Sequence, residues 1–156
     1  MALFALFFAT GAVSLVYVNL KADQPVESLP EVIFLHLPFS LYHAWIFVLL
    51  VINVFAVLSP LPAEGGAPTT FQTILAVAGL AFVASTVIGY IEYKEGDVAG
   101  ALVLAWYLFG VFSQQQDDVI HWTSLGLGIA VAAYTLKPFV FRLVGRQTGE
   151  TAPLLG

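Results

Sequence analysis

The chain alternates between long apolar blocks and short polar gaps. The blocks cover residues 2–20, 39–58, 71–91, 98–115 and 119–136. A helix needs about 20 mostly apolar residues to cross a bilayer, and the blocks are near that length, with 98–115 at the short end. Apolar residues run continuously through each block, whereas the strands of a membrane barrel alternate apolar and polar positions. The pattern predicts an all-α, polytopic membrane protein, a bundle of about five transmembrane helices.

The composition supports lipid as part of the solvent. Hydrophobic residues make up 60% of the chain and charged residues 10%, whereas soluble domains carry about 25% charged residues. The net charge of −5 argues against nucleic acid as a partner, because that partner requires basic surface. The chain has no cysteine, which excludes disulfides, thiol catalysis and cysteine-based metal sites.

The basic residues predict an orientation in the membrane. Every second gap and the tail hold all five of them, which are Lys21, Lys94, Lys137, Arg142 and Arg146. Basic residues beside membrane spans stay in the cytosol, so we expect a cytosolic carboxyl terminus and a lumenal or extracellular amino terminus. The alternative is a cleaved secretory signal over residues 1–22, which would leave four spans. Its long apolar stretch and the missing basic residues at its start favour the uncleaved helix.

The tail carries a candidate sorting signal. Residues 137–156 are predicted to form a cytosolic basic amphipathic segment, lying on anionic lipid, and then a tail. Glu150 is followed four and five residues later by Leu154 and Leu155, a pattern that places two leucines in an apolar pocket and an acid on a basic patch. We expect a clathrin adaptor to recognise it and direct the protein to an endomembrane, the vacuole or lysosome or the endosome. Chance is the alternative, because the pattern is short.

Three side chains within the blocks are candidates for ligand binding. Trp106 and Tyr107 lie in the middle of the fourth block, and Asn53 is one of the few polar residues inside the second. They are predicted to surround a cavity for a flat apolar ligand between helices. Ordinary helix packing is the alternative for all three.

The histidines are expected to be hydrogen-bonded residues near the membrane surfaces. His36 and His43 precede and open the second block, with Pro38 between them, near the acidic turn 92–97. His121 opens the fifth block, at the opposite membrane surface. Because about 20–30 Å of hydrocarbon separates the two surfaces, the three histidines cannot share a metal, and we expect no metal site.

Small residues recur at a spacing that brings helices close. The third block has Ala81, Ser85 and Gly89, four residues apart, and the fifth repeats the pattern with Gly126, Gly128, Ala130 and Ala132. Such residues let helix backbones approach each other. They predict packing within the bundle first and an interface with a partner second.

Three stretches carry a family resemblance: LHLPFSLYHAW (35–45), EGDVAGALVLAWYLFG (95–110) and VIHWTSLGLGIAV (119–131). They resemble a group of uncharacterised multi-pass membrane proteins from fungi. More distantly, they are similar to the tryptophan-rich TspO/MBR-related proteins, five-helix bundles linked to porphyrin or sterol binding. The chain has three Trp and lacks the dense Trp/Pro/Asn pattern of that group. The resemblance therefore implies an architecture and no ligand residues.

The expected function is a non-enzymatic accessory or structural subunit of a membrane complex, without a cofactor. No catalytic motif is present, the loops are short, and small-residue faces are available for a membrane-protein partner. The alternative is a binder or carrier of an apolar small molecule (lipid, sterol or porphyrin-like) within the bundle. An enzyme ranks third, because it would have to use His36, His43 and the 92–97 turn.

Overall fold

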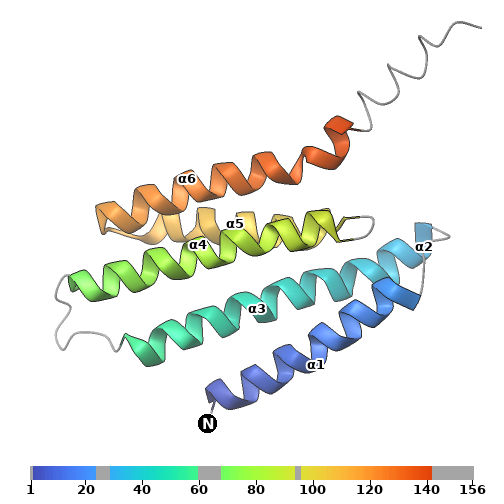
Figure 1. Ribbon diagram of the computed structural model, residues 1–156, viewed down its shortest axis with the longest axis horizontal. Helices are drawn as coiled ribbons and strands as arrows, with labels where there is room; N and C mark the ends of the chain where they lie inside the picture. Colours follow the sequence, from blue (N-terminus) through green and yellow to red (C-terminus); the bar gives the residue numbers. More distant parts are fainter. Residues whose placement is uncertain (1, 24–28, 60–67, 94–95, 142–156) are drawn as a thin grey trace, which may run out of the picture.

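The computed structural model describes residues 2–23, 29–59, 68–93 and 96–141. The long helices lie side by side in one bundle (Figure 1), and the described residues contain no strand. The elements are α1 (Ala2–Asp23), α2 (Leu29–Glu31), the π turn η1 (Val32–His36), α3 (Leu37–Leu58), α4 (Thr70–Glu92), α5 (Val98–Gln114) and α6 (Asp118–Thr135). The prediction of an all-α polytopic membrane bundle is confirmed.

Four helical segments are long and apolar enough to cross a membrane: Leu3–Asp23, Leu29–Leu58, Thr70–Glu92 and Asp118–Phe141. The fifth, α5, has 17 residues and packs against α3, α4 and α6. Helix α1 lies at the edge of the bundle and packs mainly along α3 (Figure 1). Many large apolar side chains are exposed on the outside of the bundle, which suits a protein solvated by lipid.

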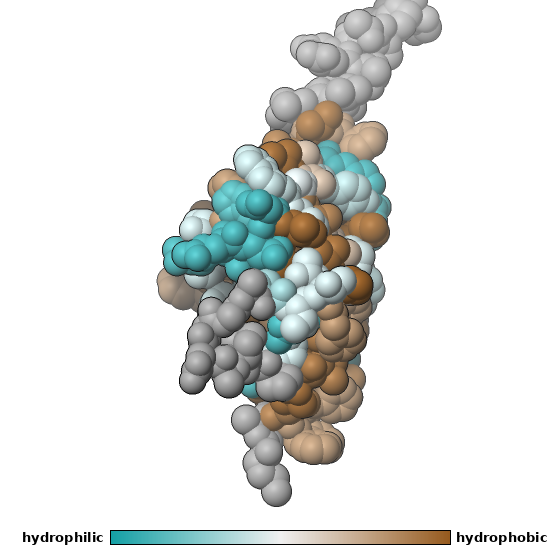
Figure 2. Space-filling model, turned by 90° about the vertical axis from the view of Figure 1, so that its left-hand side faces the viewer, coloured by the Kyte–Doolittle hydropathy of each residue, from teal (hydrophilic) through white to brown (hydrophobic). Residues whose placement is uncertain are grey.

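The two ends of the bundle differ. Helices α1, α4 and α6 finish, and α3 and α5 begin, at one end (Figure 1), which we call the Asp97 end. Figure 2 looks onto the opposite end, where hydrophilic residues gather beside apolar flanks. The polar segment from Gln114 to Asp118 lies there, and the Asp117 side chain accepts a hydrogen bond from the Ile120 N–H to cap α6.

The second long helix begins earlier than the second predicted block. That block was predicted to cover residues 39–58, whereas α2, η1 and α3 form one helical path from Leu29 to Leu58. Pro38 has no N–H to donate, and in a regular α-helix its ring clashes with the carbonyl of Phe34. The π turn widens the backbone here, with the Leu37 N–H donating to the Val32 carbonyl. The helical path therefore continues on both sides of Pro38 and does not start after it.

The small residues of α4 do not pack within the bundle, which was the first role predicted for them. Ala81, Ser85 and Gly89 are exposed, and a Cβ built on Gly89 has no atom within 4 Å. Close packing falls instead on Gly100, against the ring of Tyr90, and on Gly128, 3.3 Å from the Phe109 ring when a Cβ is added. Spacing alone did not show which face of α4 is turned toward the other helices.

Of the predicted segment 137–156, the structure describes residues 137–141, and all five are helical, after a turn at Leu136. Arg142, Arg146 and the proposed sorting residues Glu150, Leu154 and Leu155 lie outside the described residues. Their roles stay predictions.

Candidate functional site

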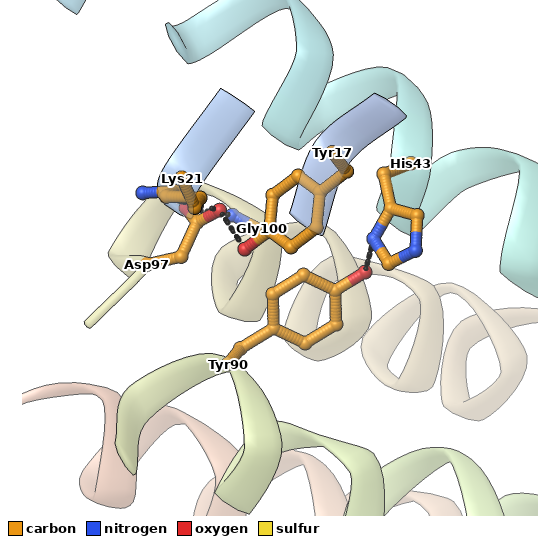
Figure 3. A network of polar contacts seen from close by, with 6 residues as sticks. All are labelled: Tyr17, Lys21, His43, Tyr90, Asp97 and Gly100. Carbon is orange, nitrogen blue, oxygen red and sulfur yellow. Dashed lines mark hydrogen bonds and ion pairs between the residues drawn. The ribbon is translucent and has the colours of Figure 1, made fainter. Parts of the chain in front are cut away.

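Asp97 is the centre of a polar network at the end of the bundle that bears its name (Figure 3). Gly96, with φ of 79°, turns the chain from α4 toward α5. Asp97 then caps α5, because its Oδ1 accepts a hydrogen bond from the Gly100 N–H at 3.0 Å. Its own N–H donates to the Tyr90 carbonyl at 2.7 Å. The side chain is only 5% exposed, so the start of α5 holds a buried carboxylate in place.

Helix α1 reaches this carboxylate with two side chains. The Tyr17 hydroxyl donates to Oδ2 of Asp97 at 2.7 Å, and the Lys21 ammonium lies 3.9 Å from the same oxygen. Tyr17 and Lys21 are four residues apart, so they share one face of α1. Both carboxylate oxygens of Asp97 thus have partners, and the edge helix is tied to the start of α5.

His43 joins the network to α3 and α4. Its ring stacks on the Tyr17 ring, with centroids 4.3 Å apart and planes 3° from parallel. Its Nδ1 is 2.6 Å from the Tyr90 hydroxyl and its Nε2 is 2.9 Å from the Ser14 hydroxyl. A neutral histidine has one donor and one acceptor nitrogen, so one hydroxyl donates and the other accepts. Four helices, α1, α3, α4 and α5, meet in this one set of contacts (Figure 3).

A groove of about 340 Å³ lies beside the network, between α1 and α4, with α3 as its floor. We call it the tyrosine groove. Its lining is Tyr17, Val18, His43, Phe47, Thr86, Gly89, Tyr90 and Tyr93. Val18, Gly89 and Tyr93 are exposed, so the groove opens on the side of the bundle. Its volume falls in the range of about 300–1,000 Å³ that is typical of small-molecule sites.

The structure does not bring Asn53, Trp106 and Tyr107 together. The Asn53 amide donates to the Leu49 carbonyl of its own helix at 2.8 Å. Trp106 is 64% exposed, and its ring lies 5.5 Å from that of Trp45. Tyr107 lines a separate cavity of about 210 Å³ between α3, α4 and α5. Neighbouring residues on a helix point about 100° apart, so Trp106 and Tyr107 face different surroundings. A ligand role for the three stays a prediction.

The histidines lie at the two ends of the bundle, as expected. His43 is hydrogen-bonded on both nitrogens, and the His121 Nδ1 is 3.1 Å from the Gln115 carbonyl at the opposite end. His36 differs from the prediction, because its buried Nδ1 has no hydrogen-bond partner among the described residues. Within the same residues, no group of three acidic or histidine side chains is placed to hold a metal ion.

Comparison with known families decides the family question. The model of the TSPO-like protein family matches residues 1–137. The chain belongs to the TSPO-like protein family. That match covers all five long helices and every residue of the network and groove, and it confirms the distant similarity to TspO-related proteins. Comparison with curated proteins and with solved structures finds no significant match. Membership supports an integral membrane protein.

The network was only partly visible in the sequence. His43 and the 92–97 turn were noted as neighbours, but Tyr17 and Tyr90 were not, because tyrosines near span ends are usually interfacial anchors. Two features of the sequence could have indicated the network. Tyr17 and Lys21 are four residues apart, so they share a helix face, and Asp97 directly precedes a helix that has Gly100 in its first turn.

Proposed function

We propose that this protein binds an apolar small molecule in the tyrosine groove. The observation that carries the proposal is the groove itself, an opening between α1 and α4 whose wall is aromatic and aliphatic. Its rings are held before a ligand arrives, because Tyr17 is bonded to Asp97 and His43 is bonded to Tyr90. A site already in its bound geometry loses less conformational freedom on binding. Membership in the TSPO-like family supports a binding role in the membrane.

The lining indicates the chemistry of the ligand. No lining residue carries a formal charge at neutral pH when histidine is neutral, so the wall offers no counter-ion. The hydroxyls of Tyr17 and Tyr90 already bond within the protein, so the ligand meets ring faces and methyl groups. A flat, neutral, apolar molecule of the lipid, sterol or porphyrin type fits this wall. It would enter sideways from the bilayer past Val18 and Tyr93.

The same contacts favour binding over catalysis. A general base needs a nitrogen that can take a proton from a substrate within hydrogen-bond reach. Both ring nitrogens of His43 are hydrogen-bonded to side chains of the protein, Ser14 and Tyr90, so a molecule in the groove would have to displace one of these partners before His43 could take its proton. We therefore propose a non-enzymatic role.

Gly89→Leu tests the groove directly. Gly89 lines the groove, and a Cβ built on it meets no atom within 4 Å, so a leucine can be introduced beside the groove without a clash. We expect the affinity for a fluorescent sterol to fall about tenfold or more in detergent-solubilised protein, because occluded volume excludes the ligand. Gly126→Leu is the matched control, because Gly126 on α6 is equally open and lies outside the groove. Equal binding by Gly89→Leu and wild type would refute the proposal.

An accessory or structural subunit is a second candidate, supported by the outward small-residue face of α4. Ala81 and Ser85 are exposed there, and small residues permit close approach of a helix from another membrane protein. We expect the double substitution Ala81→Leu and Ser85→Leu to remove a stoichiometric companion in native mass spectrometry. Ala133→Leu, at an exposed position of α6 outside the small-residue pattern, serves as the control. A solitary wild-type chain, extracted gently, would count against this role.

A further inference from the structure

A second cavity continues the tyrosine groove along the bundle. It has a volume of about 260 Å³ and lies between α3 and α4, which run side by side (Figure 1). We call it the α3–α4 cavity. Phe47 of α3 lines both the groove and this cavity. The two spaces therefore meet at Phe47 and form one path from the Asp97 end toward the opposite end.

One face of α4 borders the whole path. The α4 residues that line it follow each other at intervals of three or four, so they lie on one side of the helix. This face runs through Leu75, Gly79, Phe82, Thr86, Gly89 and Tyr93. The first and the last are about 27 Å apart, at a rise of about 1.5 Å per residue. One lipid chain fills about half of a hydrocarbon core of about 30 Å, so the path is long enough for a fully extended chain.

The polarity of the wall changes along this path. The described residues that line the α3–α4 cavity are phenylalanine, leucine, valine and glycine, so this part offers a ligand no hydrogen-bonding side chain. The Thr86 hydroxyl, in the groove, already donates to the Val83 carbonyl at 2.7 Å. Polar side chains border the path only at the Asp97 end, where Tyr93 is 40% exposed just after α4. An amphiphilic ligand would therefore place its polar end near Tyr93 and its hydrocarbon toward Leu75.

An aromatic pair borders the junction of the two spaces. The rings of Phe47 and Phe82 approach each other from α3 and α4, with centroids 5.7 Å apart. A rigid ring system of the sterol or porphyrin type cannot bend around this pair, whereas a chain of methylene groups can. Beyond the pair, α4 has no side chain at Gly79, where an added Cβ would lie 3.9 Å from Val51. The junction therefore favours a slim, flexible chain.

We infer that the path binds one single-chain lipid with a long unbranched alkyl chain and a small uncharged head, such as a long-chain alcohol. The head lies in the tyrosine groove, whose lining carries no formal charge when His43 is neutral. The chain passes Phe47 and ends in the α3–α4 cavity. This inference rests on the proposed function, because the groove receives the head, and it adds the class of ligand and the path of its chain.

The test maps where the end of the chain lies. The full protein in phosphatidylcholine nanodiscs is exposed to octanol and to hexadecanol, each with a photoactivatable group on the terminal carbon. We expect saturable labelling by both probes, competed by unlabelled hexadecanol. The octanol probe should label residues 43–47 and 86–90, beside the groove, and the hexadecanol probe residues 50–55 and 75–79. This mapping is made on the wild-type chain and needs no substitution.

Gly79→Leu blocks the far part of the path. The apparent affinity for the hexadecanol probe should fall about fivefold or more, because overfilling a packed site is costly. Binding of the octanol probe should not change, since its chain ends before Gly79. Gly89→Leu, in the groove itself, should weaken the binding of both probes. Gly126→Leu is the matched control for both, because Gly126 on α6 is open and lines neither space.

The outcomes separate this inference from the proposed function. If the two probes label the same residues, or if Gly79→Leu binds both like wild type, the inference is overturned, while weaker binding by Gly89→Leu still supports the groove. Loss of saturable labelling by both probes overturns the inference, and loss of sterol binding as well overturns the groove. Equal competition by added phosphatidylcholine would show ordinary annular lipid only. Equal competition by hexadecanoate overturns the uncharged head.

Discussion

The hydrogen bond from Tyr17 to Asp97 is expected to be the main tie between α1 and the start of α5. Tyr17→Phe removes only the hydroxyl, which donates to Oδ2 at 2.7 Å, and keeps the ring stacked on His43. Tyr17 is 6% exposed and Asp97 5%, so water does not readily replace the lost donor. Hydrogen bonds to charged groups contribute about 1.5–3 kcal/mol. Lys21 remains as a partner at 3.9 Å, so we expect the lower part of this range, about 1.5–2 kcal/mol.

The assay is reversible unfolding of the purified chain in mixed detergent, followed by circular dichroism. Tyr42→Phe is the matched control, because Tyr42 is 54% exposed on α3, and we expect it to change the free energy of unfolding by less than about 0.5 kcal/mol. A double-mutant cycle with Asp97→Ala, which removes the acceptor oxygens, isolates the pair, since residues in contact have coupling energies of about 0.5–3 kcal/mol. The reasoning is refuted if Tyr17→Phe lowers the free energy of unfolding no more than Tyr42→Phe does, and if the effects of the Tyr17 and Asp97 substitutions are additive. The hydrogen bond then does not hold α1 in place.

Three further predictions concern packing, sorting and orientation. Gly100→Ala places a Cβ into the ring of Tyr90, and we expect the unfolding free energy to fall by about 1–3 kcal/mol; a stability equal to wild type would show that the ring moves aside. Replacing the pair Leu154–Leu155 by alanines should move a tagged protein from the vacuole or endosome to the cell surface in fluorescence imaging, and unchanged delivery would refute the sorting signal. A single cysteine at Lys137 should react with an impermeant thiol reagent only after the cytosolic face is opened, and one at Gln116 without opening; the reverse pattern would invert the orientation.

The helices were predictable because the physical requirement for crossing lipid is simple. Continuous apolar runs of the necessary length can form few structures other than helices in hydrocarbon, so the five blocks matched five helices. The start of the second helix was not predictable in the same way, because it lies at Leu29, ahead of Pro38 and of the apolar block. A proline usually opens a helix, and the sequence does not reveal that a π turn accommodates its ring.

The candidate site was harder to predict, because its residues come from helices far apart in sequence. Tyr17 and Asp97 are separated by 80 residues and His43 and Tyr90 by 47. Each is unremarkable within its own segment, since tyrosines near span ends are common anchors and an aspartate before a helix is a common cap. Trp106, the most conspicuous aromatic residue of the fourth block, lies instead on the exposed side. The residue types predicted which segments lie in the membrane. The rotation of each helix about its axis, which the sequence does not show, determines which side chains face the groove.

The buried carboxylate links the fold to the proposed binding. Asp97 is held by α5 and in turn holds Tyr17, whose ring is both a wall of the tyrosine groove and the surface on which His43 stacks. Helix α1 packs mainly on α3. Loss of the Tyr17–Asp97 hydrogen bond should therefore let α1 move and change the groove, without unfolding the other four helices. Tyr17→Phe should therefore weaken the binding of a sterol or a porphyrin-like molecule even under conditions in which the variant is fully folded. Gly126→Leu should change neither the affinity nor the free energy of unfolding. A variant with weakened stability and wild-type affinity would show that the groove does not depend on the Asp97 contact.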